Sequence, residues 1–322
     1  MRVVTSFVLF LIAQIALVVG ASAADNWPDR PVKIIVPFPA GGSTDIVARE
    51  VAQGLQQKFG QPFIVENRAG AGSTVGTMAV ARSDGDGYTF LITSSHFSIV
   101  PSLYKLQYDP KKDIRGVSLL VNIPVILVAN PKVPASNVQE LIAYDKAHPG
   151  TLNFGSSGPG GINHLSGELF NYMASTKLVH VPYKGTAPAM QDLMAGNVQL
   201  MFDAISTSLP NIRAGLIKPL AWTGAKPSAV LPDLPTVAAS GIPGYDTTSW
   251  LAMFAPASTP DDIVAKVSAE VKVILDRPDV KARQEAQGVE VVASTPKELD
   301  DTVAKEMQRW SELIKRIDLK IE

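Results

Sequence analysis

The chain has 322 residues, of which 46% are hydrophobic and 18% charged, so the composition excludes a disordered or collagen-like protein. Its length fits two lobes of ordinary domain size better than one small core. Lys and Arg total 29 against 30 Asp and Glu, which gives a net charge of −1 and excludes a globally basic nucleic-acid-binding surface. Cysteine is absent, which excludes disulfides, zinc–thiolate sites, iron–sulfur clusters and thiol nucleophiles.

Residues 1–23 differ from the rest and read as a signal peptide. Arg2 is their only charge, an apolar run from Phe7 to Val19 follows, and Ala21 and Ala23 occupy the −3 and −1 places of a cleavage site. The alternative is a single anchoring helix, but the apolar run is short for a membrane span of ~20 residues. We therefore expect cleavage after Ala23 and export of a soluble protein to the periplasm.

The next residues predict a strand followed by a helix. Val32–Val36 reads as a buried strand, and a helix is expected over residues 44–59. Ser43 or Thr44 is placed to cap the start of this helix, and Gly60 to take the left-handed position at its end. Its inward face is predicted to carry apolar residues four apart, namely Val47, Val51, Leu55 and Phe59.

The same alternation continues to the end of the chain and predicts an α/β fold. Further strands are expected at residues 63–65, 88–93, 124–129, 152–154, 178–181 and 198–202. Further helices are expected at residues 77–82, from 136, from 161 through 169, 187–195 and 296–317. Capping boxes are predicted for Ser136 with Gln139 and for Thr295 with Glu298.

No flexible linker separates the two expected lobes, which suggests that the chain crosses between them more than once. The crossings are predicted near Asn122–Val125 and Thr247–Ala252, with the C-terminal helices returning to the first lobe. Lobe 1 then comprises residues 24–123 and 250–322, and lobe 2 comprises residues 124–249.

Two strand-to-helix turns are rich in glycine and small hydroxyl residues: Phe38–Asp45 and Gly155–Gly161. Such turns lie at the carboxyl ends of strands, where ligands bind, and free N–H groups at a helix start attract anions. If the turns face each other they can hold a carboxylate from both sides; the alternative is that they are simply tight turns.

Two acidic residues near these turns have two interpretations each. Asp45 either stabilises the first turn and helix start or faces the ligand, and the structural role is slightly favoured. Asp203, at the end of the strand at 198–202, either selects a donor group on the ligand or caps a helix starting near Ile205.

Signals for catalysis, metal binding and cofactor binding are poor. Gly70–Gly76 departs from a dinucleotide-binding loop, there is no Walker lysine, and neither Ser156 nor Ser157 lies in a nucleophile elbow. The histidines lack metal-ligand spacing, and His164 and His180 are each expected to be structural. We therefore expect no catalytic residues, no metal and no cofactor.

Several motifs, in order along the chain, resemble those of the Bug-type receptors of tripartite tricarboxylate transporters. They are residues 30–45 (RPVKIIVPFPAGGSTD), 65–72 (VENRAGAG), 86–89 (DGYT), 157–160 (SGPG), 180–185 (HVPYKG), 231–236 (LPDLPT) and 241–245 (GIPGY).

This resemblance implies a two-lobed periplasmic binding protein of the type II-like class, in which each lobe is a mixed sheet flanked by helices and two hinge strands join the lobes. It implies a monomer that binds a small organic carboxylate and delivers it to membrane permease subunits. The ligand-binding residues that it implies are Phe38, Ala40, Gly41, Gly42, Asp45, Thr93, Ser94, Ser157, Gly158, Gly160, Gly161, His164 and Tyr183, to which the strand-end argument adds Asp203. Gly161 departs from the family pattern, where a serine is common, so one hydroxyl donor is missing there.

Two alternatives stay open at this point. One is a sensor subunit that signals bound carboxylate to a histidine kinase. The other is an exported serine hydrolase that uses Ser156 or Ser157 with His164. Ser95, His96 and Phe97 are expected to shape the far end of the pocket, and the sequence does not identify the carboxylate.

Overall fold

Strands and helices alternate along the chain, as the sequence predicts. The computed structural model describes residues 27–319, so the predicted signal peptide lies outside the described residues. The strands are β1 (Val32–Val36), β2 (Phe63–Asn67), β3 (Thr89–Ser94), β4 (Ile114–Ala129), β5 (Asn153–Ser156), β6 (Val179–Pro182), β7 (Leu200–Ala204), β8 (Lys218–Trp222), β9 (Thr248–Pro256) and β10 (Glu290–Val291). The α-helices are α2 (Ser43–Phe59), α3 (Thr74–Ala81), α4 (His96–Ile99), α5 (Val138–Ala147), α6 (Ile162–Ala174), α7 (Thr186–Ala195), α8 (Ile205–Arg213), α9 (Asp261–Leu275), α10 (Pro278–Ala286) and α11 (Pro296–Arg316).

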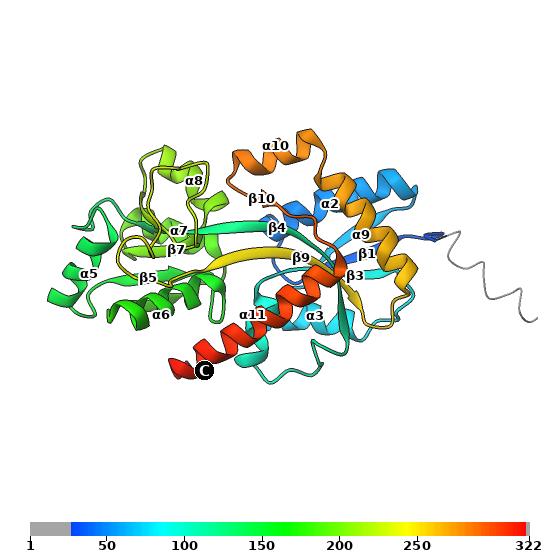
Figure 1. Cartoon of the computed structure of the whole chain (residues 1–322), viewed down its shortest axis with the longest axis horizontal. Helices are drawn as coiled ribbons and strands as arrows, with labels where there is room; N and C mark the ends of the chain where they lie inside the picture. The colour runs from blue at the N-terminus through cyan, green and yellow to red at the C-terminus, as the bar shows by residue number, and fades with distance from the viewer. Residues whose placement is uncertain (1–26, 320–322) are drawn as a thin grey trace, which may run out of the picture.

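The long strand β4 connects two groups of strands. Up to Pro124 it pairs antiparallel with β9, and from Val125 onward it pairs antiparallel with β7 and β8. The main strand order is β2-β1-β3-β9-β4-β7-β5-β6. Figure 1 shows β4 and β9 running side by side across the middle of the molecule, between the two groups of strands. They are the two connecting strands of a two-lobed α/β fold.

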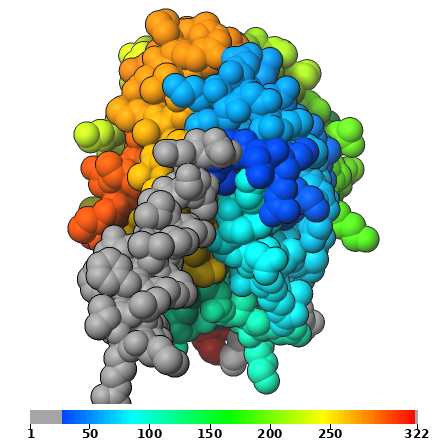
Figure 2. All heavy atoms as spheres, turned by 90° about the vertical axis from the view of Figure 1, so that its right-hand side faces the viewer, coloured from blue at the N-terminus to red at the C-terminus, as the bar shows by residue number. Residues whose placement is uncertain are grey.

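The first lobe is built on β2, β1 and β3, which are parallel, with β9 antiparallel to β3. Residues from α2, β1, β3 and α9 form its largest hydrophobic cluster. Figure 2, seen from the end of this lobe, shows α2 beside the orange C-terminal helices, although more than 200 residues separate them in sequence. The predicted inward stripe of α2 is confirmed, because Val47, Val51 and Leu55 are buried and Phe59 is half-buried.

The second lobe is built on β7, β5 and β6, which are parallel, with α5 to α8 around them (Figure 1). Its cores lie on both faces of this sheet, and one of them contains Phe154, Phe170 and Phe202. The numerical boundaries between the lobes, at residues 123/124 and 249/250, stay a prediction.

The last helix, α11, packs against both lobes. Leu299, Val303 and Met307 belong to a cluster of the first lobe, whereas Trp310 and Ile314 belong to a cluster of the second. The helix begins with the predicted capping box of Thr295 and Glu298. It therefore ties the lobes together in addition to β4 and β9.

Two predicted helix starts are wrong. Gly42, without a side-chain acceptor, is the N-cap of α2 in place of Ser43 or Thr44. Asn137 is the N-cap of α5 in place of Ser136, and it accepts from the Glu140 N–H, while Gln139 donates to the Ser240 carbonyl. At α5 two residues that can cap a helix are adjacent, and Asn137 is used together with Glu140, which accepts from the Asn137 side chain and from the Ser136 N–H.

Replacing Trp310 with alanine tests the role of α11. The Trp310 side chain is fully buried and its Nε1 donates to Glu306, so Trp310→Ala leaves a cavity and lowers the free energy of unfolding by about 3–5 kcal/mol. Lys305→Ala, on the exposed face of the same helix, changes it by less than about 0.5 kcal/mol. Denaturant unfolding measures both, and equal losses would contradict the packing described.

Candidate functional site

The first glycine-rich turn connects β1 to α2 and is exposed. Gly41 has a φ of 83°, which favours glycine, and Gly42 has an extended conformation with φ −80° and ψ 170°. The first N–H groups of a helix have no partner within the helix, and Gly42 supplies no side-chain acceptor for them. The start of α2 therefore presents backbone donors that are available to a ligand.

The Asp45 side chain stabilises this turn through hydrogen bonds. Its carboxylate accepts from the Gly41 N–H (3.0 Å), from Arg49 Nε (2.9 Å) and from Asn67 Nδ2 (3.0 Å). Asn67 also donates to the Phe38 carbonyl at 3.1 Å. The geometry supports the structural interpretation of Asp45, and the Gly41 amide is already used within the turn.

The protonation of Asp45 follows from these contacts. Burial on its own would raise the pKa of Asp45, but the hydrogen bonds from Arg49, Gly41 and Asn67, together with the charge of Arg49, hold the pKa below its ordinary value of 3.8. Asp45 is therefore ionised at neutral pH and holds the turn through its hydrogen bonds.

The second glycine-rich turn connects β5 to α6, and its own side chains hold its shape. The Gly158 N–H donates to Ser156 Oγ at 3.1 Å, and the Gly160 N–H donates to His164 Nδ1 at 3.1 Å. Gly161 is the N-cap of α6 and, like Gly42, provides no side-chain acceptor. The available donors are therefore the first backbone N–H groups of α6, whereas the amides of Gly158 and Gly160 are already used.

A stack of rings supports this turn. The rings of His164 and His180 lie 3.8 Å apart at 15°, and Phe154 stacks on both. His180 Nε2 is 2.6 Å from Ser156 Oγ. Burial, with a smaller effect of His164, lowers the pKa of His180 to about 3, so His180 is neutral at physiological pH. Both histidines support the turn, in agreement with the structural interpretation, and the ligand contact that the family resemblance implies for His164 stays a prediction.

Asp203 is fully buried and acts on the turn through Asn163. Its carboxylate accepts from Thr207 Oγ1 (2.5 Å), Ser208 Oγ (2.8 Å) and Asn163 Nδ2 (3.3 Å). Asn163 in turn accepts from Ser157 Oγ at 3.1 Å. Burial raises the pKa of Asp203, with these hydrogen bonds opposing it. The carboxylate is therefore occupied by hydroxyl groups of α8, although the N-cap of that helix is Ala204 and not Asp203. A contact of Asp203 with a ligand stays a prediction.

Tyr183 is also engaged within its own lobe. Its hydroxyl donates to Asp192 Oδ2 at 2.6 Å, and burial together with Asp192 raises the pKa of Tyr183 to about 12. The main chain of Tyr183 borders the turn, because its N–H donates to the Ser156 carbonyl and its carbonyl lies against Gly158. Tyr183 therefore lines the turn with backbone and directs its hydroxyl toward α7.

The two turns meet at His96, the first residue of α4. The His96 ring lies edge-on to Phe38 with centroids 5.4 Å apart. On its other side, a Cβ added to Gly161 would lie 3.0 Å from His96 Nε2 and 3.4 Å from Ser157 Oγ. One imidazole thus separates the β1–α2 turn from the start of α6, and the turns share one junction between the lobes.

The end of β3 contributes two buried hydroxyls beside this junction. Ser94 Oγ is 2.9 Å from His96 Nδ1. Thr93 is fully buried, and within residues 27–319 its hydroxyl has no hydrogen-bond partner. The sequence indicates both residues, but it gives His96 only a general role at the far end of the pocket. Its position two residues after the end of β3 is the sequence signal that indicates this place.

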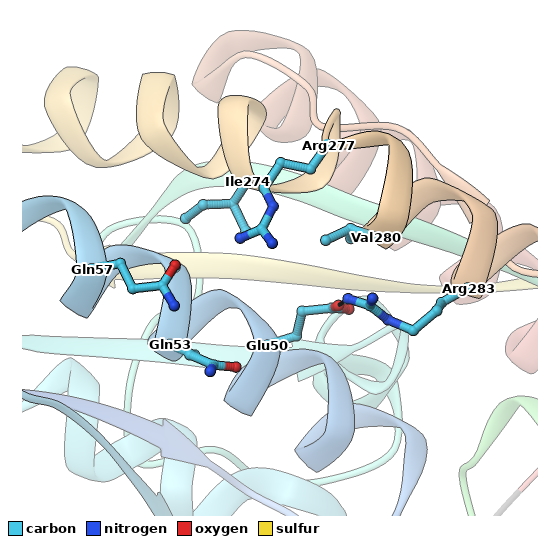
Figure 3. Close-up of a pocket in the computed structure, with 8 residues that line it drawn as sticks. Glu50, Gln53, Gln57, Ile274, Arg277, Val280 and Arg283 are labelled. Atoms are coloured by element: carbon cyan, nitrogen blue, oxygen red, sulfur yellow. Dashed lines mark hydrogen bonds and ion pairs between the residues drawn. The ribbon is translucent and has the colours of Figure 1, made fainter.

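A hollow elsewhere on the first lobe does not provide a second anion site. It lies between α2, α9 and α10 and is lined by Arg277 and Arg283, among others (Figure 3). Arg283 pairs with Glu50 at 2.5 Å and with Asp279 at 3.1 Å, and Arg277 pairs with Asp279. These two arginines are matched by two carboxylates, so little positive charge is left for an anion.

Residues 27–319 contain neither a membrane-spanning helix nor a cluster of metal ligands. In that part of the chain no helix has the length and apolar character needed to cross a bilayer. In the same residues, no group of three or more histidine and acidic side chains is arranged to hold a metal ion.

The chain is similar to known proteins over nearly its whole length. Residues 47–319 match the model of the tripartite tricarboxylate transporter family receptor. Among curated proteins, BugT of Bordetella pertussis is 37% identical over 306 residues, which cover 93% of each chain. A protein encoded in the tcbD-tcbE intergenic region of a Pseudomonas species is 34% identical over 311 residues, covering 94% of this chain and 93% of that protein.

Solved structures show the same similarity. An R. palustris protein solved with adipate has 36% identity and a TM-score of 0.86, covering 91% of this chain and 99% of that one. The periplasmic binding protein BugD has 36% identity and a TM-score of 0.84, covering 92% and 100%. MatC from Rhodopseudomonas palustris with bound malate has 35% identity and a TM-score of 0.83, covering 89% and 100%. The fold is that of the α/β periplasmic binding proteins.

The hydrogen bonds of ionised Asp45 in the first turn predict that the free energy of unfolding depends on pH. Asp45→Asn removes a buried charge-assisted network and lowers the free energy of unfolding at pH 7 by about 1–3 kcal/mol. Because the folded-state pKa is depressed, the wild-type contribution is present above the ordinary aspartate pKa and is lost as pH falls through the folded-state pKa.

The difference between wild type and Asp45→Asn should therefore shrink as pH falls below about 4, as measured by denaturant unfolding at pH 7, 5 and 3.5. Asp84→Asn, at an exposed aspartate, is the control and should show no such difference. A constant difference across this pH range would show that Asp45 does not hold the turn as an ionised group.

Proposed function

Because this chain belongs to the receptor family of the tripartite tricarboxylate transporters, we propose that it is a periplasmic receptor that binds a small organic carboxylate between its lobes and delivers it to membrane permease subunits. The observation that carries the proposal is that the β1–α2 turn and the start of α6 meet at His96, and that neither α2 nor α6 has a side-chain cap.

The proposed ligand contacts are the backbone N–H groups at the starts of α2 and α6, which follow the glycines of each turn. The amides of Gly41, Gly158 and Gly160 are used internally, so the carboxylate is held by the first backbone N–H groups of α2 and α6. Phe38, Ala40, Gly42 and Gly161 then shape the approach to these donors, while Asp45 and His164 hold the turns.

Energies of ordinary size are sufficient for such a site. A helix terminus stabilises an anion by about 0.3–2 kcal/mol, and each charge-assisted hydrogen bond contributes about 1.5–3 kcal/mol. Four or five contacts thus reach the roughly 8 kcal/mol of a micromolar complex without an arginine. Two similar proteins have been solved with adipate and with malate, which supports a carboxylate as the ligand class.

Binding proceeds by closure of the lobes around the ligand. β4 and β9 are the strands on which the lobes turn, and their pairing shifts register between Gly116 and Ser118 and between Leu119 and Val121. A carboxylate that contacts both helix starts binds the closed state better than the open one and shifts the equilibrium between them.

A binding role without catalysis agrees with the serine and histidine geometry. Ser157 Oγ donates to Asn163, and the serine–histidine pair that is formed is Ser156 with His180. Ser156 is fully buried and the pKa of His180 is about 3, so the pair lacks both access and a base active at neutral pH. We therefore propose that the chain is not a hydrolase.

The setting of this receptor is the periplasm. The signal peptide at residues 1–23 directs export, with cleavage after Ala23, and the mature protein acts as a monomer with a carboxylate and the permease as its partners. Neither a cofactor nor a nucleic acid takes part.

A thermal-shift screen of mono- and dicarboxylates tests the ligand class. A ligand at about 100 times its Kd stabilises the folded state by about 2.7 kcal/mol, which raises the melting temperature by several degrees. We expect a subset of carboxylates to do so and matched amines and neutral amides not to. Stabilisation by amines with none by carboxylates would overturn the proposal.

The first turn offers a substitution that tests the position of the site. A Cβ added to Gly42 meets nothing closer than the Pro39 carbonyl at 3.8 Å, so Gly42→Val fits the fold while it obstructs the start of α2. Loss of two or more charge-assisted hydrogen bonds should weaken binding of the carboxylate found by the screen at least about tenfold.

Calorimetric titration measures this effect, with denaturant unfolding to verify that stability is retained. Ala304→Val, on the exposed face of α11, is the matched control and should bind as wild type does. Unchanged affinity in Gly42→Val would exclude the first turn from the site.

A further inference from the structure

A short segment that follows β3 of the first lobe packs into the core of the second lobe. It comprises α4 and the short helix η2 (Val100–Ser102), both of which contact α11. Ile99 is fully buried in the cluster of the second lobe that also contains Ile162 and Leu165, two residues of the first turn of α6. Leu103, directly after η2, packs against the same cluster. This segment therefore joins the core that supports the start of α6.

Leu103 and Tyr104 contact the second glycine-rich turn directly. Both of their backbone N–H groups donate to the Val100 carbonyl, at 3.0 and 2.9 Å, which fixes the positions from which the two side chains extend. A Cβ added to Gly160 would lie 3.0 Å from Leu103 Cδ1 and 3.7 Å from Tyr104 Cε2. The first distance is shorter than an ordinary contact between carbon atoms of about 3.5–4.0 Å, so Leu103 leaves too little room for a methyl group at Gly160.

The ring of Tyr104 also reaches a loop of the first lobe. A Cβ added to Gly72, between β2 and α3, would lie 3.2 Å from both Cε2 and Oη of Tyr104. Gly72 and Gly160 both have a positive φ, 62° and 76°, which favours glycine. One ring is thus packed between two glycine-rich loops, one from each lobe, and it sets the spacing between them.

Gly160 is held from two directions. Its N–H donates to His164 Nδ1 at 3.1 Å, within the second lobe, whereas its Cα faces Leu103. Gly161, the N-cap of α6, comes next in the chain, so a displacement of Gly160 also displaces the first N–H groups of α6. Hydrogen bonds weaken steeply as their angle departs from linearity, and a binding site needs its donors held to within about 0.5 Å.

We propose that Leu103 and Tyr104 are positioning residues of the carboxylate site: by packing against Gly160 they fix the start of α6 where its N–H groups meet the anion. Both act through Gly160 and not by contact with the carboxylate. This inference rests on the proposed function, because it concerns a helix start to which that function assigns the anion. The contact joins residues that follow β3 to a turn of the second lobe, so it links the ligand donors of one lobe to the fold of the other.

A double-mutant cycle between Gly160 and Leu103 tests this role. Malate, adipate, pyruvate and benzoate are titrated calorimetrically into the mature wild-type protein, and the acid that binds tightest is used with every variant. The variants are Gly160→Ala, Leu103→Ala and the combination of both. Gly150→Ala is the matched control, because Gly150 has nearly the same φ, 75°, and a Cβ there meets nothing within 4 Å.

We expect Gly160→Ala to weaken binding by about tenfold or more, because the added methyl group meets Leu103 and displaces the turn. Leu103→Ala itself should weaken binding by about threefold or more, because the turn loses its support. In the Leu103→Ala background, Gly160→Ala should cost less than about threefold, because the smaller side chain leaves room for the methyl group.

Gly150→Ala should leave affinity unchanged in both backgrounds. Backbone strain at a positive φ is common to Gly150 and Gly160, and denaturant unfolding measures it. A loss of affinity confined to Gly160→Ala, and relieved by Leu103→Ala, therefore separates positioning from a purely structural role.

The contribution of Tyr104 is tested by Tyr104→Ala and Tyr104→Phe. The ring contacts both Gly72 and Gly160, so Tyr104→Ala should weaken binding by about threefold or more, and Tyr104→Phe should restore it to within about twofold of wild type. An equal loss in both variants would assign the effect to the hydroxyl group and contradict positioning by the ring.

Two further outcomes would overturn the inference, and they are distinguishable. If Gly160→Ala leaves affinity unchanged, or weakens binding equally with and without the Leu103 side chain, Leu103 does not position the turn, although the proposed function stands. If none of the four acids binds wild type, the proposed function fails and the positioning role fails with it.

Discussion

Unpaired backbone N–H groups at the starts of α2 and α6 are the feature on which the rest of the structure depends. Both helices begin at a glycine that offers no side-chain acceptor. The turn before α2 and the start of α6 lie beside the same imidazole, His96, which contacts Phe38 on one side and Gly161 on the other. Backbone donors at a packed junction require acceptors, and an anion that reaches both helix starts satisfies them together.

The surrounding elements hold these donors in place. Asp45, ionised and bound by Arg49 and Asn67, fixes the first turn. The stacked pair of His164 and His180 and the buried carboxylate of Asp203 fix the second turn. β4 and β9 connect the lobes, and α11 packs on a core of each. The polar side chains of the turns therefore mainly hold the turns in place, and the proposed ligand contacts are backbone N–H groups.

The sequence predicted most strands and helices of the first two thirds of the chain, and the buried stripe of α2, because hydrophobic periodicity reports burial. It predicted two connecting strands because no flexible linker separates the lobes. It predicted less well where two adjacent residues can serve the same role. Ser136 and Asn137 are both good caps, and only the folded chain shows that Asn137 is used. The sequence also could not show that the Gly41 and Gly160 amides are consumed by Asp45 and His164, or that His96 lies between the lobes.

The most direct test of this account is a crystal structure of the mature protein with a dicarboxylate that calorimetry shows to bind. The account predicts one carboxylate within hydrogen-bond distance of the first-turn N–H groups of both α2 and α6, directly or through one ordered water. A ligand bound at the arginine-lined hollow between α2, α9 and α10, or in contact with only one lobe, would contradict it.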